Sequence, residues 1–137
     1  EYVLPECGVD AAGKMPDRKI YIMGYSLAGL FALWALMEKP VLSGAISCSG
    51  SLWYPDFMGK IQNDCHKLHG KKIYLSVGGK EANTKDPLMA NVITCTKETY
   101  GLLKDQNDVK YELNSGGHFA DAGKRLAKGL RWMLEEE

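Results

Sequence analysis

A serine within a run of small residues is the clearest chemical feature of this 137-residue chain. Ser26 lies at the centre of residues 23–29 (MGYSLAG), after a short apolar extended segment and before an apolar segment of helical length. This context is typical of a nucleophile elbow, a tight strand-to-helix turn that presents a serine at the end of a sheet. Ala28 stands where the usual motif has its second glycine, and alanine is the smallest replacement. The alternative is that Ser26 only caps the following helix.

A serine hydroxyl is a weak nucleophile and needs a positioned base, and His118 is the best placed of the three histidines. It lies in a glycine-rich segment, residues 114–119 (NSGGHF), directly after the last predicted strand. In open parallel sheets ligands bind beyond the carboxyl ends of the strands, where the Ser26 turn also lies. We expect His66 and His69, which have polar neighbours, to lie at the surface. The alternative for His118 is a loop histidine that caps the last helix.

A carboxylate should accept the ring proton of His118 and stabilise the imidazolium that forms. Glu81 and Asp86 both lie in the predicted loop 78–86, between the serine and the histidine in the chain. We prefer Glu81, because Asp86 is already explained as a helix cap before Pro87 and Glu81 lies closer to the end of the preceding strand. A solvated loop charge is the alternative for Glu81, and Asp56 is an outside candidate for the acid.

The loop after the second predicted strand, residues 47–57 (SCSGSLWYPDF), could line a substrate pocket. Small-molecule pockets usually combine apolar walls with a few polar groups. We therefore expect Ser51 and Trp53, together with Tyr25 beside the nucleophile, to contact substrate. An equally good interpretation is that the aromatic residues of this loop pack beneath it.

Short apolar segments alternate with segments of helical period along the chain. The strands are predicted over residues 19–23, 44–48, 72–77 and 109–113. The helices are predicted over residues 27–37, 57–68, 88–103 and 121–134. The first helix is apolar nearly all round, so we expect it to be buried on most sides. In the last helix we expect Leu126, Leu130, Met133 and Leu134 to form the buried face.

Strands that alternate with helices predict the α/β class, a mostly parallel sheet with helices on its faces. No linker or internal repeat interrupts the pattern, so residues 1–137 are expected to form a single domain.

The composition excludes several other classes of protein. The 17 basic residues balance the 17 acidic ones and 45% of residues are hydrophobic, which argues against disorder and against a nucleic-acid-binding protein. No apolar run reaches the roughly 18 residues of a membrane span. The four cysteines show neither a CxxC pair nor zinc-like spacing, so we expect free thiols, no metal and a cytoplasmic location, with a disulfide as the lesser alternative.

Four segments in order, GYSLAGLFALWAL, SCSGSLWYP, LSVGGKEANTKDPLMA and NSGGHF, resemble the putative esterase family of α/β-hydrolases. That family includes esterase D and the enterochelin-type siderophore esterases, and the resemblance extends from about Tyr2 to Leu134. It implies hydrolysis of small-molecule esters without metal or organic cofactor. It also implies that Ser26 is the nucleophile, His118 the base and Glu81 the acid.

The resemblance begins well inside the family's usual domain, and Glu1 in place of methionine predicts a processed or excised piece. An α/β-hydrolase sheet has about eight strands, of which about four are predicted here. One donor of the oxyanion hole, the backbone N–H of Leu27, is present, whereas the other would belong to the first half of the domain. Half a sheet would leave strand 19–23 as an open edge, which we expect a second copy of the chain to cover. Missing upstream residues and a trimmed fold are alternatives.

We therefore expect a serine esterase that forms an acyl-enzyme. The alternative function is a non-catalytic binding module that kept the fold and lost part of the oxyanion hole.

Overall fold

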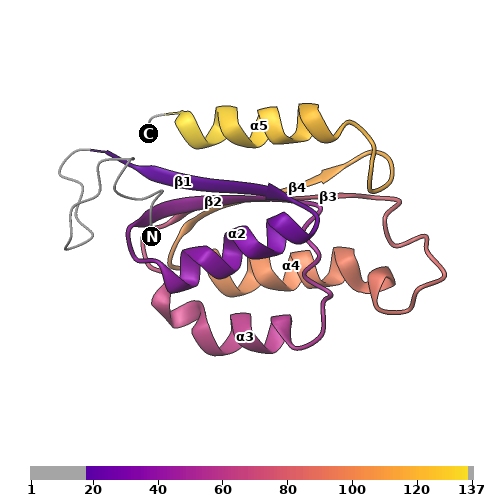
Figure 1. The fold of residues 1–137 in the computed structure, drawn as a ribbon, viewed down its shortest axis with the longest axis horizontal. Coiled ribbons are helices and arrows are strands. Elements are labelled where there is room, and N and C mark those ends of the chain that lie inside the picture. Colours follow the sequence, from indigo (N-terminus) through magenta and orange to yellow (C-terminus); the bar gives the residue numbers. More distant parts are fainter. Residues whose placement is uncertain (1–17, 136–137) are drawn as a thin grey trace.

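The computed structural model describes residues 18–135, which form a four-stranded parallel sheet with helices on both faces (Figure 1). The strands lie in the order of the chain: β1 (Ile20–Tyr25), β2 (Leu42–Cys48), β3 (Lys72–Gly78) and β4 (Asp108–Asn114). The helices are α2 (Leu27–Glu38), α3 (Phe57–Asp64), α4 (Val92–Leu103) and α5 (Ala122–Leu134), with short 3-10 turns η1 (Cys65–Lys67) and η2 (Met89–Asn91). The predicted α/β class is confirmed.

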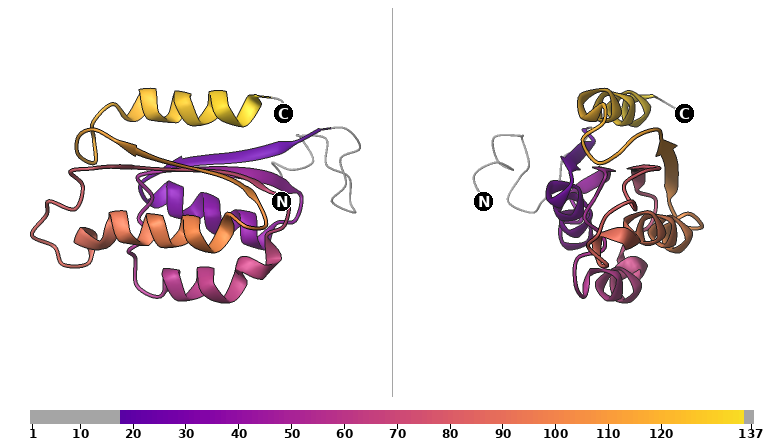
Figure 2. Two further views of the ribbon diagram at one scale, coloured as in Figure 1. Left: turned by 180° about the vertical axis from the view of Figure 1, so that it is seen from behind. Right: turned by 90° about the vertical axis from the view of Figure 1, so that its right-hand side faces the viewer.

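Helices α2 and α4 pack on one face of the sheet, with α3 farther out on the same side, and α5 is the one described helix on the other face (Figures 1 and 2). The larger core lies between the sheet and α2, α3 and α4, and its fully buried members include Ala32, Ala45, Ile73 and Leu75. A smaller cluster lies under α5 and consists of Ile46, Cys48, Tyr74 and Met133. Because β2 and β3 are covered on both faces, nearly all of their side chains are buried, as expected of central parallel strands.

All four predicted strands are present, and three of them extend further toward their carboxyl ends than predicted. The extension of β1 to Tyr25 matters most, since it places Ser26 immediately after the strand and directly before α2. The segments around Ser26, Glu81 and His118 follow the carboxyl ends of β1, β3 and β4, so they lie at the same end of the parallel strands.

The expectation that the first helix is buried on most sides is wrong. In α2, Leu27 is 60% exposed, Phe31 53% and Trp34 37%, and the rings of Phe31 and Trp34 stack with centroids 5.6 Å apart. α2 packs against β1 and β2, but β1 has only one neighbouring strand within residues 18–135. The outer side of α2 therefore faces no other described element.

The buried face of α5 also differs from the prediction. Arg125, Gly129 and Met133 are buried, whereas the predicted face residues Leu130 and Leu134 are exposed. Gly129 is the reason, because the helix lies so close to the sheet there that a Cβ would come within 2.8 Å of side-chain atoms of both Ile46 and Tyr74.

The third helix begins later than predicted. Asp86 does cap a turn, since its Oδ1 accepts hydrogen bonds from the N–H groups of Leu88 and Met89 at 2.9 and 3.1 Å. That turn leads into η2, and α4 starts only at Val92. Leu88 and Met89 are consequently exposed rather than part of the buried stripe.

The sequence predicts free thiols and no membrane-spanning segment. Cys48, Cys65 and Cys95 are free thiols, and Cys7 lies outside the described residues. Within residues 18–135, no helix has the length and apolar character needed to cross a bilayer.

Candidate active site

Ser26 occupies a strained turn between β1 and α2. Its φ of 58° and ψ of −121° are rarely adopted by residues other than glycine. The turn closes tightly, because a Cβ on Gly24 would lie 2.1 Å from the carbonyl oxygen of Ala28 and a Cβ on Gly29 would lie 2.9 Å from Ser47 Oγ. Ala28 itself is exposed, which explains why a methyl group is tolerated at the position where the usual motif has glycine.

Backbone hydrogen bonds anchor this turn to the loop after β2. The N–H of Ser26 donates to the carbonyl of Cys48 at 3.0 Å, and the carbonyl of Ser26 accepts from the N–H of Ser51 at 3.0 Å. The Ser26 side chain makes no capping hydrogen bond to α2, contrary to the alternative in which it serves only as a cap.

Three side chains from three loops form a series of hydrogen bonds at the carboxyl end of the strands. His118 Nε2 lies 3.0 Å from Ser26 Oγ, and His118 Nδ1 lies 2.8 Å from Glu81 Oε2. Both distances are within the normal hydrogen-bonding range. The imidazole is 26% exposed and therefore reachable from solvent, whereas the carboxylate is 2% exposed. The residues are separated by 92 and 37 positions in the chain, so only the tertiary fold brings them together.

The surroundings of Glu81 favour its charged form. Burial by itself would raise the pKa of this carboxyl, but hydrogen bonds from Ser49 Oγ, His118 and the N–H of Gly78 outweigh it and hold the pKa below its usual value. An ionised carboxylate can only accept hydrogen bonds, so His118 Nδ1 carries the proton and Nε2 is free to accept one from Ser26.

The other two acid candidates lie away from the imidazole. Asp86 is exposed and its carboxylate caps the turn before η2. Asp56 is exposed in a left-handed conformation just before α3. Glu81 is the candidate that contacts His118.

The three residues predicted to contact substrate differ in their burial and in the direction of their side chains. Ser51 is buried and its Oγ lies 3.4 Å from Ser26 Oγ. Trp53 is half-buried, in the same loop. Tyr25 is also half-buried, but its hydroxyl is directed into the protein, where it donates to the carbonyl of His118. The N–H of Leu27 is the first of α2, and such a group has no acceptor within its own helix.

Two side chains of the site were missed by the sequence analysis. Ser49 lies in the loop already singled out, and its positive φ of 46° aims its hydroxyl at Glu81. Arg125 reaches the site from α5, with Nη1 3.4 Å from Glu81 Oε1 and a side chain only 3% exposed. No sequence signal distinguishes Arg125, because an arginine on an amphipathic helix normally points to solvent.

Ionisable groups also cluster away from this site: Lys60 pairs with Glu38 and Asp64, and Glu112 contacts Lys128 and the Tyr74 hydroxyl. His66 and His69 are exposed, as expected. Across residues 18–135 no group of three or more His, Cys, Asp or Glu side chains is arranged to hold a metal ion.

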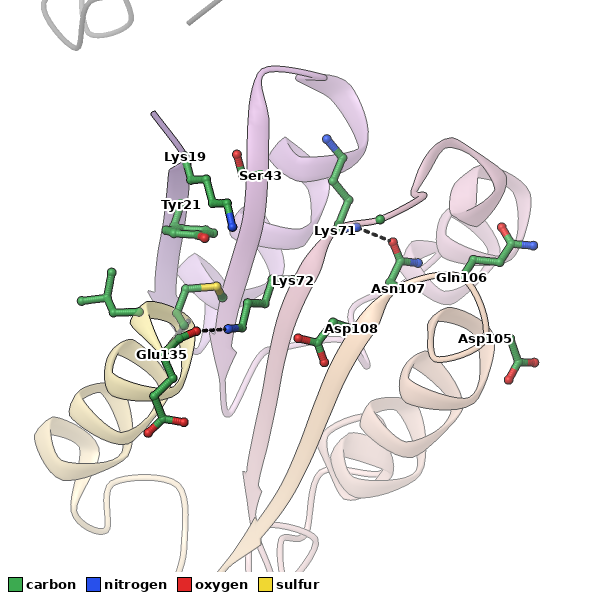
Figure 3. Close-up of a pocket in the computed structure, with 13 residues that line it drawn as sticks. Lys19, Tyr21, Ser43, Lys71, Lys72, Asp105, Gln106, Asn107, Asp108 and Glu135 are labelled. Carbon is green, nitrogen blue, oxygen red and sulfur yellow. Dashed lines mark hydrogen bonds between the residues drawn. The ribbon is translucent and has the colours of Figure 1, made fainter. Parts of the chain in front are cut away.

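A hollow lies at the opposite, amino-terminal end of the strands (Figure 3). Two of its three lysines are bonded to the backbone: Lys72 Nζ donates to the carbonyl of Glu135 at 2.7 Å, and Lys71 Nζ donates to that of Leu42 at 2.7 Å. It is remote from Ser26 and contains none of the predicted site residues.

Solved structures of several hydrolases share this fold. The enterobactin esterase FES of Shigella flexneri superposes with a TM-score of 0.70 at 24% identity, covering 97% of this chain and 36% of that one. The siderophore hydrolase EstA of Aspergillus nidulans gives 0.66 at 20% identity, covering 97% and 54%. An IroE-like serine hydrolase of Shewanella oneidensis gives 0.67 at 16% identity, covering 82% and 39%. At these identities the likeness establishes the α/β-hydrolase fold.

Sequence comparison agrees with the structural neighbours. The uncharacterized protein YbbA of Bacillus subtilis (strain 168) is 26% identical over 119 residues, which are 82% of this chain and 48% of YbbA. The chain thus spans about half the length of the relative it matches. The profile of the family described as "Putative esterase" matches residues 8–127. With most of its length matched, the chain belongs to the putative esterase family.

Proposed function

We propose that this chain carries the nucleophile, base and acid of a serine esterase that cleaves carboxylic esters. The observation that carries the proposal is the series Ser26 Oγ, His118 and Glu81, joined by contacts of 3.0 and 2.8 Å. Membership of an esterase family supports the same reaction class.

In the proposed mechanism, His118 Nε2 takes the proton of Ser26 as Oγ attacks the ester carbonyl. Glu81 stabilises the imidazolium that forms, and the N–H of Leu27 donates to the oxyanion. The tetrahedral intermediate then collapses, His118 gives the proton to the departing alcohol, and an acyl-enzyme remains. Water, activated by His118 in the same way, releases the acid and restores the Ser26 hydroxyl.

The substrate we propose is a small-molecule ester that lies along the loop after β2. Ser51 Oγ of that loop lies 3.4 Å from Ser26 Oγ, and Trp53 is a half-buried aromatic residue of the same loop. The siderophore and enterobactin esterases among the structural neighbours make siderophore-type esters the first substrates to assay.

The test is covalent labelling with a fluorophosphonate probe. Wild-type protein should be labelled, and Ser26→Ala should abolish labelling because it removes the attacking oxygen. Ser43→Ala is the matched control, since Ser43 lies at the opposite end of the sheet. Labelling that survives Ser26→Ala, or wild-type protein that takes no label, would remove Ser26 from the role.

A non-catalytic binding module is the second candidate, and one feature favours it. Among the described residues, the oxyanion donor next to Ser26 is the N–H of Leu27, and losing one such donor typically lowers the rate about 100- to 1,000-fold. A binding module would show ligand-dependent stabilisation, no turnover of p-nitrophenyl esters, and indifference to His118→Ala.

We also propose that a second copy of the chain covers the open edge of β1. Met23 and Leu27 are exposed beside that edge, and Phe31 and Trp34 extend the apolar surface along α2. We further propose a cytoplasmic location, because Cys48, Cys65 and Cys95 are free thiols and free thiols are typical of reducing compartments.

A further inference from the structure

Arg125 is a buried cation for which the proposed chemistry has no use. It approaches the site from α5, on the face of the sheet opposite to α2 (Figure 1). Its Nε and Nη2 find no hydrogen-bond partner within residues 18–135. Buried charged groups are normally fully paired, and an incompletely paired one contributes little to stability. Its presence therefore calls for a reason other than stability.

Tyr25 is the main partner of this guanidinium. Arg125 Nη1 donates to the Tyr25 hydroxyl at 2.9 Å, whereas Glu81 Oε1 lies at 3.4 Å, beyond the range of a good hydrogen bond. The guanidinium carbon also lies 5.5 Å from the centre of the Tyr25 ring, within the range of a cation–π contact. Arg125 thus holds Tyr25 by both its hydroxyl and its ring.

The direction of the next hydrogen bond follows from the available protons. A guanidinium only donates, so the Tyr25 oxygen accepts from Arg125 and the single Tyr25 proton must go to another acceptor. That acceptor is the backbone carbonyl of His118. Ser49 Oγ lies 3.3 Å from the Tyr25 hydroxyl, but its own proton is used in the shorter bond to Glu81.

We propose that Arg125 and Tyr25 are positioning residues that hold the His118 loop in register with Ser26, an inference that rests on the proposed function. Tyr25 is adjacent to Ser26 in the chain, so its bond to His118 ties the base to the turn that carries the nucleophile. Two glycines, Gly116 and Gly117, precede His118, and glycine has more backbone freedom than any other residue, so contacts of the His118 backbone itself help to fix the loop. A displacement of about 1 Å in a catalytic group can lower the rate about 100-fold.

The first test compares kinetics with stability. Tyr25→Phe removes only the hydroxyl, and Arg125→Met removes the charge at similar volume. Each should lower kcat about 10- to 100-fold with KM nearly unchanged, because positioning acts on the chemical step. The Tm of Arg125→Met should fall only slightly, because the guanidinium is incompletely paired and Glu81, whose contact with it is long at 3.4 Å, keeps its bonds from Ser49, His118 and Gly78. A fall in Tm that accounts for the lost activity would overturn the proposal.

Two control variants match these changes. Tyr111→Phe removes a buried tyrosine hydroxyl that has no partner in the described part of the chain, and Arg131→Met removes an exposed arginine of α5. Both should retain the wild-type kcat. The double variant Tyr25→Phe/Arg125→Met should lose less than about 2-fold beyond Tyr25→Phe, because both residues act through one bond. Fully multiplicative losses would contradict a shared route.

A spectroscopic test makes the proposal independent of turnover. In the resting protein the Nδ1 proton of His118, bonded to Glu81, should give a slowly exchanging NMR signal. Faster exchange in Tyr25→Phe and Arg125→Met, but in neither control, would support the positioning role even if wild-type protein takes no fluorophosphonate label and the esterase proposal fails. An unchanged signal in both variants would overturn the positioning role while leaving the labelling of Ser26 as a separate result.

Discussion

At the scale of single residues, Glu81 shows how a buried carboxylate is kept charged. Its side chain is nearly inaccessible, yet Gly78 N–H, Ser49 Oγ and His118 Nδ1 all donate to it. Each such charge-assisted bond is stronger than a neutral one, and together they offset the loss of hydration. The consequence is a permanent acceptor behind His118, which sets the tautomer needed to take a proton from Ser26.

The depressed pKa of Glu81 predicts a stability that depends on pH. In the unfolded chain a glutamate has a pKa of about 4.3, and in the folded protein the pKa of Glu81 lies lower. The stabilising contribution is therefore fully present above about pH 4.3 and is lost as the pH falls through the folded pKa. Glu81→Gln should remove this part of the acid sensitivity, measured as the free energy of unfolding by urea between pH 7 and 3.

Glu81→Gln also distinguishes the contribution of Glu81 to stability from its proposed contribution to catalysis. At neutral pH, Glu81→Gln should cost about 1–3 kcal/mol of stability, because the amide cannot satisfy all three donors. Esterase turnover should fall by up to about 10⁴-fold, since the wrong histidine tautomer would be favoured. Glu98→Gln, on the exposed side of α4, should follow the wild-type curves. A Glu81→Gln protein with wild-type turnover would exclude Glu81 as the acid.

At the scale of elements, α5 is placed by a glycine rather than by a leucine stripe. The close approach at Gly129 lets Met133 fill the cluster with Ile46 and Tyr74, and it brings Arg125 down to the level of the site. Because Gly129 faces the sheet, the neighbouring Leu130 points away from it and is exposed.

Gly129→Ala should test that placement. The new methyl group would lie 2.8 Å from atoms of Ile46 and Tyr74, both fully buried, so the free energy of unfolding should fall by about 1–3 kcal/mol. Gly123→Ala is the matched control in the same helix, because nothing lies within 4 Å of its Cβ position. That variant should gain about 0.5–1 kcal/mol from helix propensity. Equal effects at both positions would contradict a close contact at Gly129.

At the scale of the whole molecule, the open edge of β1 adjoins the apolar side of α2. Exposed apolar residues at a strand edge are a surface at which chains associate. Phe31 and Trp34, the two aromatic residues of α2, are exposed and stack on each other on the helix that follows Ser26. Association through this surface would bring a second chain close to the turn that holds Ser26.

Sedimentation velocity at micromolar concentration tests this association. Wild-type protein should sediment as a dimer, and Phe31→Glu should shift it toward monomer because a charge would be buried in the interface. Leu102→Glu, which changes an exposed leucine of α4, should leave the dimer intact. A stable wild-type monomer would contradict the proposed pairing of two copies.

Much of the fold and part of the site could be predicted because the signals are local. The apolar runs of β2 and β3 are short and bounded by small residues, which identifies buried strands without any tertiary information. The glycines around Ser26 likewise report a tight turn, and the segments that hold Glu81 and His118 both follow predicted strands. Choosing Glu81 over Asp86 depended on recognising that Asp86 already had a capping role, which its bonds to Leu88 and Met89 bear out.

The sequence by itself determined the α/β class, the order of strands and helices, and the residue types at the candidate site, because these depend on periodicity and on turn chemistry within a few neighbours. Only the tertiary structure decided which side of α2 is exposed, which face of α5 is buried, and that Arg125 lies behind Tyr25 and Glu81. Those outcomes depend on how closely two distant segments can approach. The missing Cβ at Gly129 lets α5 approach the sheet closely, and β1 has no second neighbouring strand among residues 18–135 to cover the side of α2. Neither effect changes the periodicity of the sequence.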